Sequence, residues 1–377
     1  MSNKNKEKIS ENTFFITGGG TGGHIYPAVS VIEELKSQGI KNENIYYLGN
    51  KKNLEYEIAS KNGYNFLNYG AKGMPRKVSL EFVIWMWELL ISTIIAFGYV
   101  LKYKPNVVFA TGGYVCAPIL FCALFLRIPY VLHDCDIHPG IVTRFFAPWA
   151  NSVSLAFSDA QKRIKSKNVS INGNPIRKEF KEISKKQARE ELSLKDAFTI
   201  LIMGGSLGAR TINNSSFKIL KEFANKEGFE ILWQTGKKNF DDVTKKILDE
   251  FQELPDNLVL QPYFEKMYLA LLSSDLVISR AGSLSLSEIC ASSLSAILIP
   301  YPYAAANHQY KNAKSFVDNK MALMLEDKDC NNDSLYEMVI NLINDKKLLS
   351  DLAYNAYKAA QTDAAQKIVD NIKKAMK

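Results

Sequence analysis

Short runs of β-branched and aromatic residues alternate with longer helical stretches along this chain of 377 residues. A strand buried on both faces reads as a continuous apolar run, and the helix that joins it to a parallel neighbour reads as a 3.6-residue period. The predicted strands cover residues 13–17, 44–48, 106–110, 130–133, 152–155 and 169–175 in the first half, and 198–203, 229–234, 258–261, 276–279 and 296–300 in the second. The pattern therefore predicts an α/β protein with parallel sheets.

Two glycine-rich turns open two similar halves of the chain. Gly18–Gly23 follows the first predicted strand, Gly204–Gly208 follows the strand over 198–203, and each turn leads into a helix. We therefore predict two Rossmann-like domains. The predicted parts are a first domain over 1–175, a second over 176–350 that opens with a charged helical stretch over 179–194, and a terminal segment over 351–377, within a long helix over 346–376, that packs back towards the first domain.

The segment Leu80–Leu101 is long and apolar enough to cross a membrane. Glu88 near its centre argues against a span, because an acid at that depth costs about 2.5–3.5 kcal/mol. A span would also place the first glycine-rich turn and everything after Lys102 on opposite sides of a membrane. A narrow polar stripe at helical spacing runs along the segment and consists of Glu81, Trp85, Glu88 and Ser92. Two alternatives remain, a plain core helix and a helix in a membrane interface, and the second would be favoured by the cations Lys72, Arg76 and Lys77 and the aromatics Trp85 and Trp87.

Composition narrows the choice of partners only slightly. The formal net charge of +8 favours anionic partners such as nucleotides, diphosphates or an acidic membrane surface. The five cysteines are odd in number and form no CxxC pair, which is typical of reduced thiols in a cytosolic protein. The charged start, MSNKNKEKISEN, has no apolar run and predicts no secretory signal.

The first glycine-rich turn can bring backbone N–H groups close to an anion, because glycine permits positive φ and the following helix presents N–H groups at its start. By itself, such a turn serves dinucleotides, phosphates or tight packing alone. A nicotinamide cofactor needs an acid after the second strand, where the chain has Gly49 and Asn50, and a P-loop needs a Gly-Lys-Ser/Thr ending that is missing. His24, directly after the turn, is either a general base beside a bound diphosphate or a capping or surface histidine.

Three further clusters contain reactive residue types. The run 133–138 (HDCDIH) has metal-ligating side chains, but neighbours at a strand end point to opposite faces and no second cluster completes a tetrahedron, so no metal site is predicted. In the run 280–288, Glu288 either binds two ribose hydroxyls or forms a capping box with Ser285. The run 307–309 (NHQ) lies at the carboxyl edge of the predicted sheet, where open α/β sheets bind ligands.

Together and in this order, the motifs resemble the MurG family, whose members are UDP-N-acetylglucosamine transferases acting on lipid-linked N-acetylmuramoyl-pentapeptide in peptidoglycan synthesis. The resemblance covers nearly the whole chain and is carried by GGTGGH at 19–24, TGGY at 111–114, HDCDIHPG at 133–140, GNPIR at 173–177, GGSLGAR at 204–210, SLSLSE at 283–288 and NHQ at 307–309. It implies a GT-B fold, in which two Rossmann-like domains face each other across a cleft. It also implies transfer of GlcNAc from UDP-GlcNAc with inversion, without a cofactor or a tightly held metal.

The resemblance further implies roles for particular residues. His24, as the base, and Glu288, on the ribose hydroxyls, would be the catalytic residues. The implied UDP-GlcNAc-binding residues are Thr21, Gly22, Gly23, Asp136, Arg177, Ser206, Phe264, Ser283, Leu284, Ser285, Leu286, Ser287, Glu288, His308 and Gln309. The implied acceptor-binding residues, on the side that takes the undecaprenyl-diphosphate-linked muramoyl-pentapeptide, are Gly19, Gly20, Gly112, Gly113 and Tyr114. The protein would be peripheral on the cytoplasmic side of the cell membrane, attached through Lys72, Arg76, Lys77 and Leu80–Leu101, and would bind no nucleic acid.

The chain departs from the family pattern at two positions. Asp136 stands where one form of the family has Asn, and Leu207 stands where the family has Gln, so each position lacks a side-chain amide. Other functions stay open. They are a GT-B enzyme with a different lipid-linked acceptor, a nonhydrolysing UDP-sugar epimerase, a dinucleotide-binding oxidoreductase and a binding module without turnover.

Overall fold

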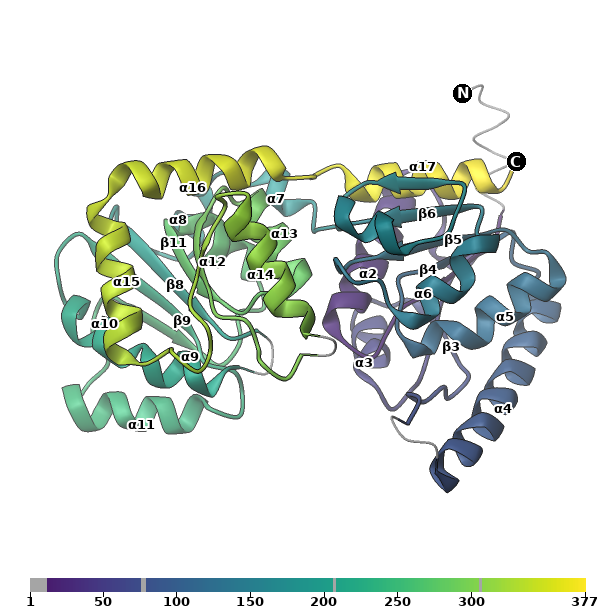
Figure 1. Cartoon of the computed structure of the whole chain (residues 1–377), viewed down its shortest axis with the longest axis horizontal. Coiled ribbons are helices and arrows are strands. Elements are labelled where there is room, and N and C mark those ends of the chain that lie inside the picture. The colour runs from purple at the N-terminus through teal and green to yellow at the C-terminus, as the bar shows by residue number, and fades with distance from the viewer. Residues whose placement is uncertain (1–11, 76–78, 206–207, 305–306) are drawn as a thin grey trace. The chain divides into compact units, whose positions relative to one another are not determined.

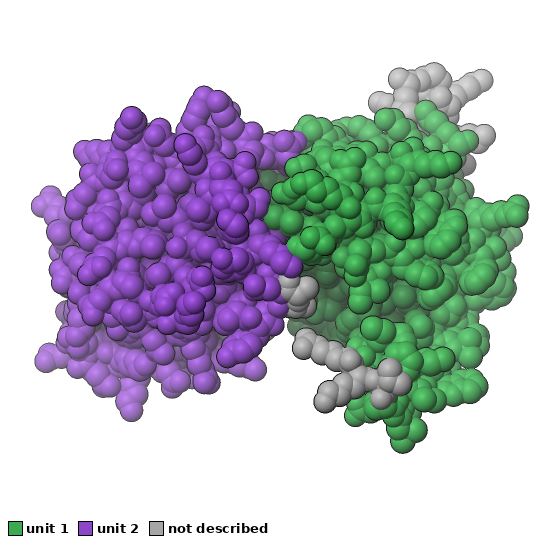
Figure 2. Space-filling model, viewed as in Figure 1, with its two compact units in different colours: residues 1–176, 363–377 green, residues 177–362 purple. Residues whose placement is uncertain are grey.

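The computed structural model describes residues 12–75, 79–205, 208–304 and 307–377. The chain divides into two compact units, which Figure 2 colours separately. Unit 1 is Met1–Ile176 together with Asp363–Lys377, and unit 2 is Arg177–Thr362.

Unit 1 contains, among its described residues, a seven-stranded sheet of order β3-β2-β1-β4-β5-β6-β7. Its strands are β1 (Phe14–Thr17), β2 (Ile45–Gly49), β3 (Asn65–Asn68), β4 (Val107–Ala110), β5 (Tyr130–Asp134), β6 (Ser152–Leu155) and β7 (Val169–Ile171), and all of them pair in parallel. The order reverses beside β1, as in Rossmann folds, so the carboxyl ends of β1 and β4 are neighbours. This is the edge at which such sheets bind ligands.

The helices of unit 1 cover both faces of this sheet (Figure 1). They are α2 (Gly22–Ser37), α3 (Leu54–Lys61), α4 (Leu80–Tyr103), α5 (Ala117–Leu126), α6 (Ile141–Phe146) and α17 (Ala364–Ala375). Because successive side chains of a strand point to opposite faces, Phe14 and Ile16 of β1 pack in one core layer with α2 and α17, whereas Phe15 packs in the other with α5.

Unit 2 contains, within the described part of the chain, a six-stranded parallel sheet of order β10-β9-β8-β11-β12-β13. Its strands are β8 (Phe198–Met203), β9 (Phe229–Gln234), β10 (Leu258–Gln261), β11 (Leu276–Ser279), β12 (Ser295–Leu298) and β13 (Leu323–Met324). Its helices are α7 (Glu179–Glu182), α8 (Lys185–Glu191), α9 (Arg210–Ser215), α10 (Phe217–Phe223), α11 (Phe240–Phe251), α12 (Met267–Ser273), α13 (Ser283–Ala291), α14 (His308–Asp318), α15 (Asn332–Asn344) and α16 (Lys346–Ala359). The prediction of two Rossmann-like folds is confirmed.

The strands predicted from the sequence are present, with ends shifted by a few residues, but two edge strands and two helix breaks were missed. Both strands lie at sheet edges: β3 has asparagine at each end, and β13 is only two residues long. The stretch 179–194 is two helices, because Ser184 caps α8 through a capping box with Gln187. The predicted single terminal helix is wrong as well: α16 ends at Ala359 and α17 begins at Ala364.

Helix α4 exposes most of its apolar residues, whereas in its polar stripe Ser92 is buried, Trp85 and Glu88 are half-buried and only Glu81 is exposed. Ser92, Ala96 and Val100 are buried, whereas a long series of apolar side chains is exposed: Leu80, Val83, Ile84, Met86, Trp87, Leu90, Ile91, Ile94, Ile95, Phe97 and Leu101. Among the described residues it is the one helix long and apolar enough to cross a membrane, and 11% of its most apolar window is buried. The plain core helix is therefore the wrong alternative.

The polar stripe of α4 is tied to the segment before it. The ammonium group of Lys72 forms an ion pair with Glu88, and the indole N–H of Trp85 donates to the carbonyl oxygen of Lys72 (3.0 Å). Lys72 therefore has an anionic partner within the protein. The other expected cations, Arg76 and Lys77, lie outside the described residues.

Candidate active site

His24 lies in the first turn of α2, and its ring contacts the turn that follows the neighbouring strand β4. Its Nδ1 is 3.0 Å from the carbonyl oxygen of Thr111, the residue after β4. Because a carbonyl oxygen only accepts, this contact assigns the proton to Nδ1 and leaves Nε2 as the nitrogen that can accept a proton. The thiol sulfur of Cys135 lies 3.5 Å from the same Nδ1. The half-buried imidazole is thus held through Nδ1, and Nε2 is the nitrogen that stays available as a proton acceptor.

The turn after β4 needs glycine because it passes close to the first glycine-rich turn. Gly112 and Gly113 have φ of +94° and +82°, which only glycine adopts without strain. A Cβ on Gly112 would lie 3.2 Å from His24 Nδ1, and one on Gly113 would lie 2.4 Å from the carbonyl oxygen of Gly19. The ring of Tyr114 covers Gly20, 3.2 Å from where a Cβ would be. The structure therefore brings together the residues expected to bind the acceptor.

A buried carboxylate that the sequence did not reveal supports this turn. Glu55, in the first turn of α3, is fully buried. It accepts the backbone N–H groups of Gly20 (3.4 Å) and Asn50 (3.2 Å) and the side-chain amide of Asn53 (3.0 Å). From sequence alone, Glu55 looks like an ordinary acid at a helix N-terminus. Its burial depends on how α3 packs beside the glycine-rich turn.

The loop after β5 brings Asp136 to the same edge of the sheet. Asp134 closes this loop by accepting the backbone N–H groups of Asp136 (3.2 Å) and Gly140 (3.0 Å). Burial raises the pKa of Asp134, while its hydrogen bond with Thr143 acts in the opposite direction. Asp136 itself is half-buried beside Cys135, the residue whose thiol reaches His24.

His133, which starts the run 133–138, has a structural role. Its ring is completely buried, with Nε2 3.1 Å from Asn174 Oδ1 and Nδ1 3.2 Å from Ser154 Oγ. Burial lowers its pKa to about 4, so the ring is neutral at physiological pH. Across the described residues, no group of three or more His, Cys, Asp or Glu is placed to hold a metal ion.

In unit 2, Glu288 lies in the second turn of α13, close to Arg177. The helix begins at Ser283 with Gly282 as its N-cap and no side-chain cap, so the alternative of a capping box with Ser285 is wrong. Burial raises the pKa of Glu288 to about 7, although the positive charge of Arg177 lowers it. The Arg177 guanidinium also donates to the carbonyl oxygen of Glu265 (3.3 Å). A carboxyl perturbed in this way is typical of functional sites.

Gln234, at the end of β9, joins two other expected parts of the donor site. Its Oε1 accepts the backbone N–H of Phe264 (2.9 Å), and its Nε2 donates to the carbonyl oxygen of Gly205 in the second glycine-rich turn (3.2 Å). Ser206 of that turn lies outside the described residues. Gln234 was not predicted, although a polar residue at the carboxyl end of a buried strand is a signal that could have identified it.

The residues expected along the start of α13 are not equivalent. Leu284, Ser285 and Ser287 are half-buried, and Ser283 is nearly buried at 5% exposure. Leu286 points into the core, and its N–H donates to the carbonyl oxygen of Gly282 (2.9 Å). The first turn of a helix has N–H groups without intrahelical acceptors, so this end of α13 can bind an anion.

At the start of α14, His308 and Gln309 are both half-buried. They follow Asn307, whose φ of +55° is left-handed. The side chain of Gln309 accepts the backbone N–H of Tyr301 through Oε1 (3.0 Å). The turn after β12 thus fixes the orientation of Gln309.

Solved structures share this architecture. A crystal structure of MurG from Acinetobacter baumannii is 26% identical with a TM-score of 0.74, over 96% of this chain and 99% of that one. A UDP-GlcNAc 2-epimerase from Neisseria meningitidis, solved with UDP-GlcNAc, has a TM-score of 0.68 over 96% of this chain and 100% of that one, but is 14% identical, which shows the fold alone.

Two Rossmann-like units, each with a glycine-rich turn and candidate ligand groups at its carboxyl edge, define a GT-B glycosyltransferase. Residues 14–155 match the Glycosyltransferase family 28 N-terminal domain, and residues 199–372 match the Glycosyltransferase family 28 C-terminal domain. The chain belongs to the MurG family within this glycosyltransferase family.

Curated relatives support this assignment over nearly the full length. The UDP-N-acetylglucosamine--N-acetylmuramyl-(pentapeptide) pyrophosphoryl-undecaprenol N-acetylglucosamine transferase of Carboxydothermus hydrogenoformans is 36% identical over 354 residues, 93% of this chain and 94% of the relative. The enzyme of the same name from Desulforamulus reducens is 34% identical over 363 residues, 95% of this chain and 97% of the relative.

Proposed function

We propose that this chain transfers N-acetylglucosamine from UDP-GlcNAc to the lipid-linked N-acetylmuramoyl-pentapeptide, converting lipid I to lipid II in peptidoglycan synthesis. The observation that carries the proposal is the near full-length match, at 36% and 34% identity, to relatives named for this transfer. The likeness to an epimerase is one of fold, at 14% identity, and does not favour that alternative.

In the proposed reaction, an acceptor hydroxyl attacks the anomeric carbon of UDP-GlcNAc from the face opposite UDP. The new glycosidic C–O bond forms as the bond to the UDP oxygen breaks, so the anomeric configuration inverts. His24 takes the hydroxyl proton at Nε2, because the Thr111 carbonyl holds the other ring nitrogen in its protonated form. The leaving diphosphate carries the electron pair away.

Unit 2 supplies the groups that stabilise this leaving group. Arg177 and the N-terminal turn of α13 offer positive charge and N–H donors to the diphosphate, which needs no tightly held metal. Glu288 binds the ribose hydroxyls, the backbone of Phe264 lies against uracil, and His308 and Gln309 contact the sugar. The other residues of unit 2 proposed to bind UDP-GlcNAc are Ser206, Ser283, Leu284, Ser285, Leu286 and Ser287. Those of unit 1 are Thr21, Gly22, Gly23 and Asp136.

Unit 1 binds the acceptor in this proposal. Gly19 and Gly20 lie in the turn that precedes His24, and Gly112, Gly113 and Tyr114 lie against that turn and the His24 ring. The N–H of Gly20 is already donated to the Glu55 carboxylate (3.4 Å), so the acceptor would contact other groups of these residues.

The same proposal makes the protein peripheral on the cytoplasmic face of the cell membrane, with α4 as its docking element. The exposed apolar face of α4 is accompanied by other exposed apolar side chains of unit 1: Phe125, Ile141, Phe145 and Trp149. Exposed apolar side chains of this number and size fit a membrane interface. In this proposal, insertion of apolar side chains contributes more to membrane binding than attraction of Lys72 to anionic lipid, because the charge of Lys72 is already paired with Glu88.

The experiment that tests the proposed reaction is transfer of radiolabelled GlcNAc from UDP-GlcNAc to a lipid I analogue by the purified chain. The expected result is a labelled lipid-linked disaccharide and free UDP. Hydrolysis or epimerisation of UDP-GlcNAc without that product would contradict the proposal. Omitting the lipid I analogue is the control for hydrolysis.

A further inference from the structure

Arg280, the residue directly after β11, joins the segments that leave the carboxyl ends of neighbouring strands. Its side chain is 11% exposed. Its Nη1 donates to the carbonyl oxygens of Ile299 (3.0 Å) and Pro300 (3.3 Å), which follow β12. It also forms an ion pair with Asp327, which follows β13. Since β11, β12 and β13 are parallel, one guanidinium holds three loops at the ligand-binding edge of the sheet.

The segment after β12, which Arg280 contacts at Ile299 and Pro300, also contacts the side chain of Gln309. The guanidinium carbon of Arg280 lies over the ring of Tyr301, 5.5 Å from its centroid. The backbone N–H of Tyr301 donates to Gln309 Oε1 (3.0 Å). Arg280 therefore fixes the carbonyl groups of Ile299 and Pro300. The next N–H group, that of Tyr301, fixes Gln309 in the first turn of α14.

Asp327 extends the network to the second glycine-rich turn. Its Oδ2 accepts the hydroxyl of Thr211 (3.1 Å), which lies in α9, the helix that follows the turn. A continuous set of contacts thus runs from α9 through Asp327 and Arg280 to Gln309. Each contact stays within unit 2.

We infer that Arg280 is a positioning residue of the donor site, which sets the orientation of Gln309 towards the sugar of UDP-GlcNAc without touching the substrate. This inference rests on the proposed function, because it takes the carboxyl edge of unit 2 as the donor site. Lysine is not equivalent to arginine in this role, because its ammonium lacks the planar group that lies over the ring of Tyr301 while Nη1 contacts two carbonyl oxygens and the carboxylate of Asp327.

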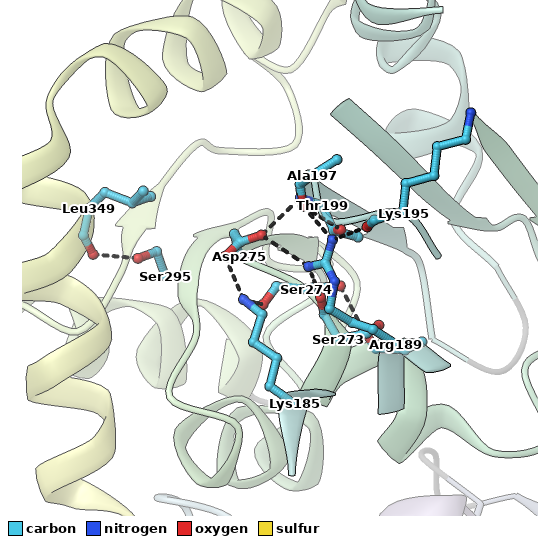
Figure 3. A network of polar contacts seen from close by, with 11 residues as sticks. Lys185, Arg189, Lys195, Ala197, Thr199, Ser273, Ser274, Asp275, Ser295 and Leu349 are labelled. Atoms are coloured by element: carbon cyan, nitrogen blue, oxygen red, sulfur yellow. Dashed lines mark hydrogen bonds and ion pairs between the residues drawn. The ribbon is translucent and has the colours of Figure 1, made fainter. Parts of the chain in front are cut away.

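Arg189 offers a matched control at the amino ends of two strands of the same sheet, and Figure 3 shows the polar network around it. Its side chain is 12% exposed. Its guanidinium donates to the carbonyl oxygens of Ser273 (3.0 Å) and Lys195 (2.6 Å), and it lies 3.8 Å from Asp275. Ser273 and Asp275 precede β11, and Lys195 precedes β8. Arg189 therefore makes the same kinds of contact as Arg280, with two carbonyl oxygens and a carboxylate, but at the amino ends of the strands.

The experiment compares Arg280→Lys with Arg189→Lys in the full-length chain. Thermal midpoint, kcat, and KM for UDP-GlcNAc and for the lipid I analogue are measured for each, together with the Kd of UDP. For Arg280→Lys we expect KM for UDP-GlcNAc to rise about tenfold, with acceptor KM within about twofold. The Kd of UDP, which lacks the sugar, should change by less than about threefold. Arg189→Lys should lower the thermal midpoint with UDP-GlcNAc KM within about twofold.

Two results would overturn the inference. One is a lower thermal midpoint in Arg280→Lys with an unchanged KM for UDP-GlcNAc, and the other is an equal rise of that KM in both variants. Asp327→Asn, which removes only the charge partner of Arg280, carries the same prediction if Arg280→Lys yields no folded protein. The unmodified chain separates a failure of the proposed function from a failure of the positioning role. If the unmodified chain transfers no GlcNAc, the proposed function fails. If it does transfer GlcNAc and the variants keep its KM for UDP-GlcNAc, only the positioning role of Arg280 is rejected.

Discussion

At the scale of single residues, the carboxyl of Glu288 titrates near neutrality because it is desolvated, and Arg177 offsets this only in part. An ionised carboxylate has two acceptor oxygens for ribose hydroxyls, whereas the protonated form has lost part of that capacity. We predict that ionisation of Glu288 contributes to a rise of kcat/KM for UDP-GlcNAc with pH through about 7, and that this rise is smaller in Glu288→Gln, which keeps only the contribution of the base His24. The pH profiles of both proteins check the prediction, and an identical rise in the variant would assign the titration to another group.

The same carboxyl should make stability depend on pH. Its folded-state pKa of about 7 lies above the ordinary value of 4.5 for a glutamate, so the folded protein binds this proton more tightly than the unfolded chain. The stabilising contribution is therefore fully present below about 4.5 and is lost as pH rises through about 7. The expected loss is about 1–3 kcal/mol. Urea unfolding of the unmodified chain and of Glu288→Gln between these pH values measures it, and parallel curves would refute it.

Replacement of His24 should affect the chemical step of the reaction without affecting the binding of UDP-GlcNAc. Glutamine at this position can still donate to the Thr111 carbonyl but cannot take a proton at the position of Nε2. We expect His24→Gln to lower kcat by about 10²–10⁴ while KM for UDP-GlcNAc stays within about threefold. Steady-state kinetics with both substrates checks this, with the thermal midpoint as control for folding. A kcat within a factor of ten of the original would place the base elsewhere.

At the scale of elements, α4 differs from a core helix because its small and polar residues, Ser92 and Ala96, face unit 1 and its large apolar residues face outward. We predict that changing Ile84, Trp87, Ile91 and Ile94 to Ser reduces binding to vesicles of anionic phospholipid at least about tenfold, because each change removes apolar area that would leave water. Vesicle flotation measures the binding.

The matched control for α4 is the pair Tyr354→Ser and Tyr357→Ser on α16, which also removes exposed aromatic side chains. The control should bind vesicles as the unmodified chain does. Turnover of a short-chain, water-soluble acceptor should be unchanged by the α4 substitutions. Equal binding by the α4 variant and the unmodified chain would reject α4 as the docking element.

At the scale of the whole molecule, the end of the chain completes the core of its first unit. Ile368, Val369 and Ile372 of α17 are fully buried in the layer that contains Phe14 and Ile16 of β1. Unit 1 therefore cannot close this core layer until α17 has been synthesised, although the rest of the unit lies within Met1–Ile176.

We predict that Ile368→Ala lowers the free energy of unfolding by about 2–4 kcal/mol, because it leaves a cavity in a packed layer. Urea unfolding followed by tryptophan fluorescence measures the change. The exposed Lys374 on the same helix provides the control, since Lys374→Ala should stay within about 0.5 kcal/mol of the original. A loss below about 1 kcal/mol for Ile368→Ala would show that α17 contributes little to this core.

The sequence by itself determined the positions of the inner strands, the two glycine-rich turns and the motifs of the family. These features depend on local order along the chain: a buried strand needs a continuous apolar run, and a turn that approaches another backbone needs glycine. The residues expected around the acceptor turn also come together in the fold, because Gly112 and Gly19 follow neighbouring parallel strands.

Tertiary structure alone decided which charged groups are buried and which apolar face is left uncovered. Glu55 and Arg280 are ordinary charged residues in the sequence, and only packing against distant segments removes them from water and gives them partners. The pattern of α4 fits a core helix as well as an interfacial one, because periodicity shows that two faces differ but not which one the rest of the chain covers. Burial is a property of contacts between remote segments, and so it could not be derived from residue order.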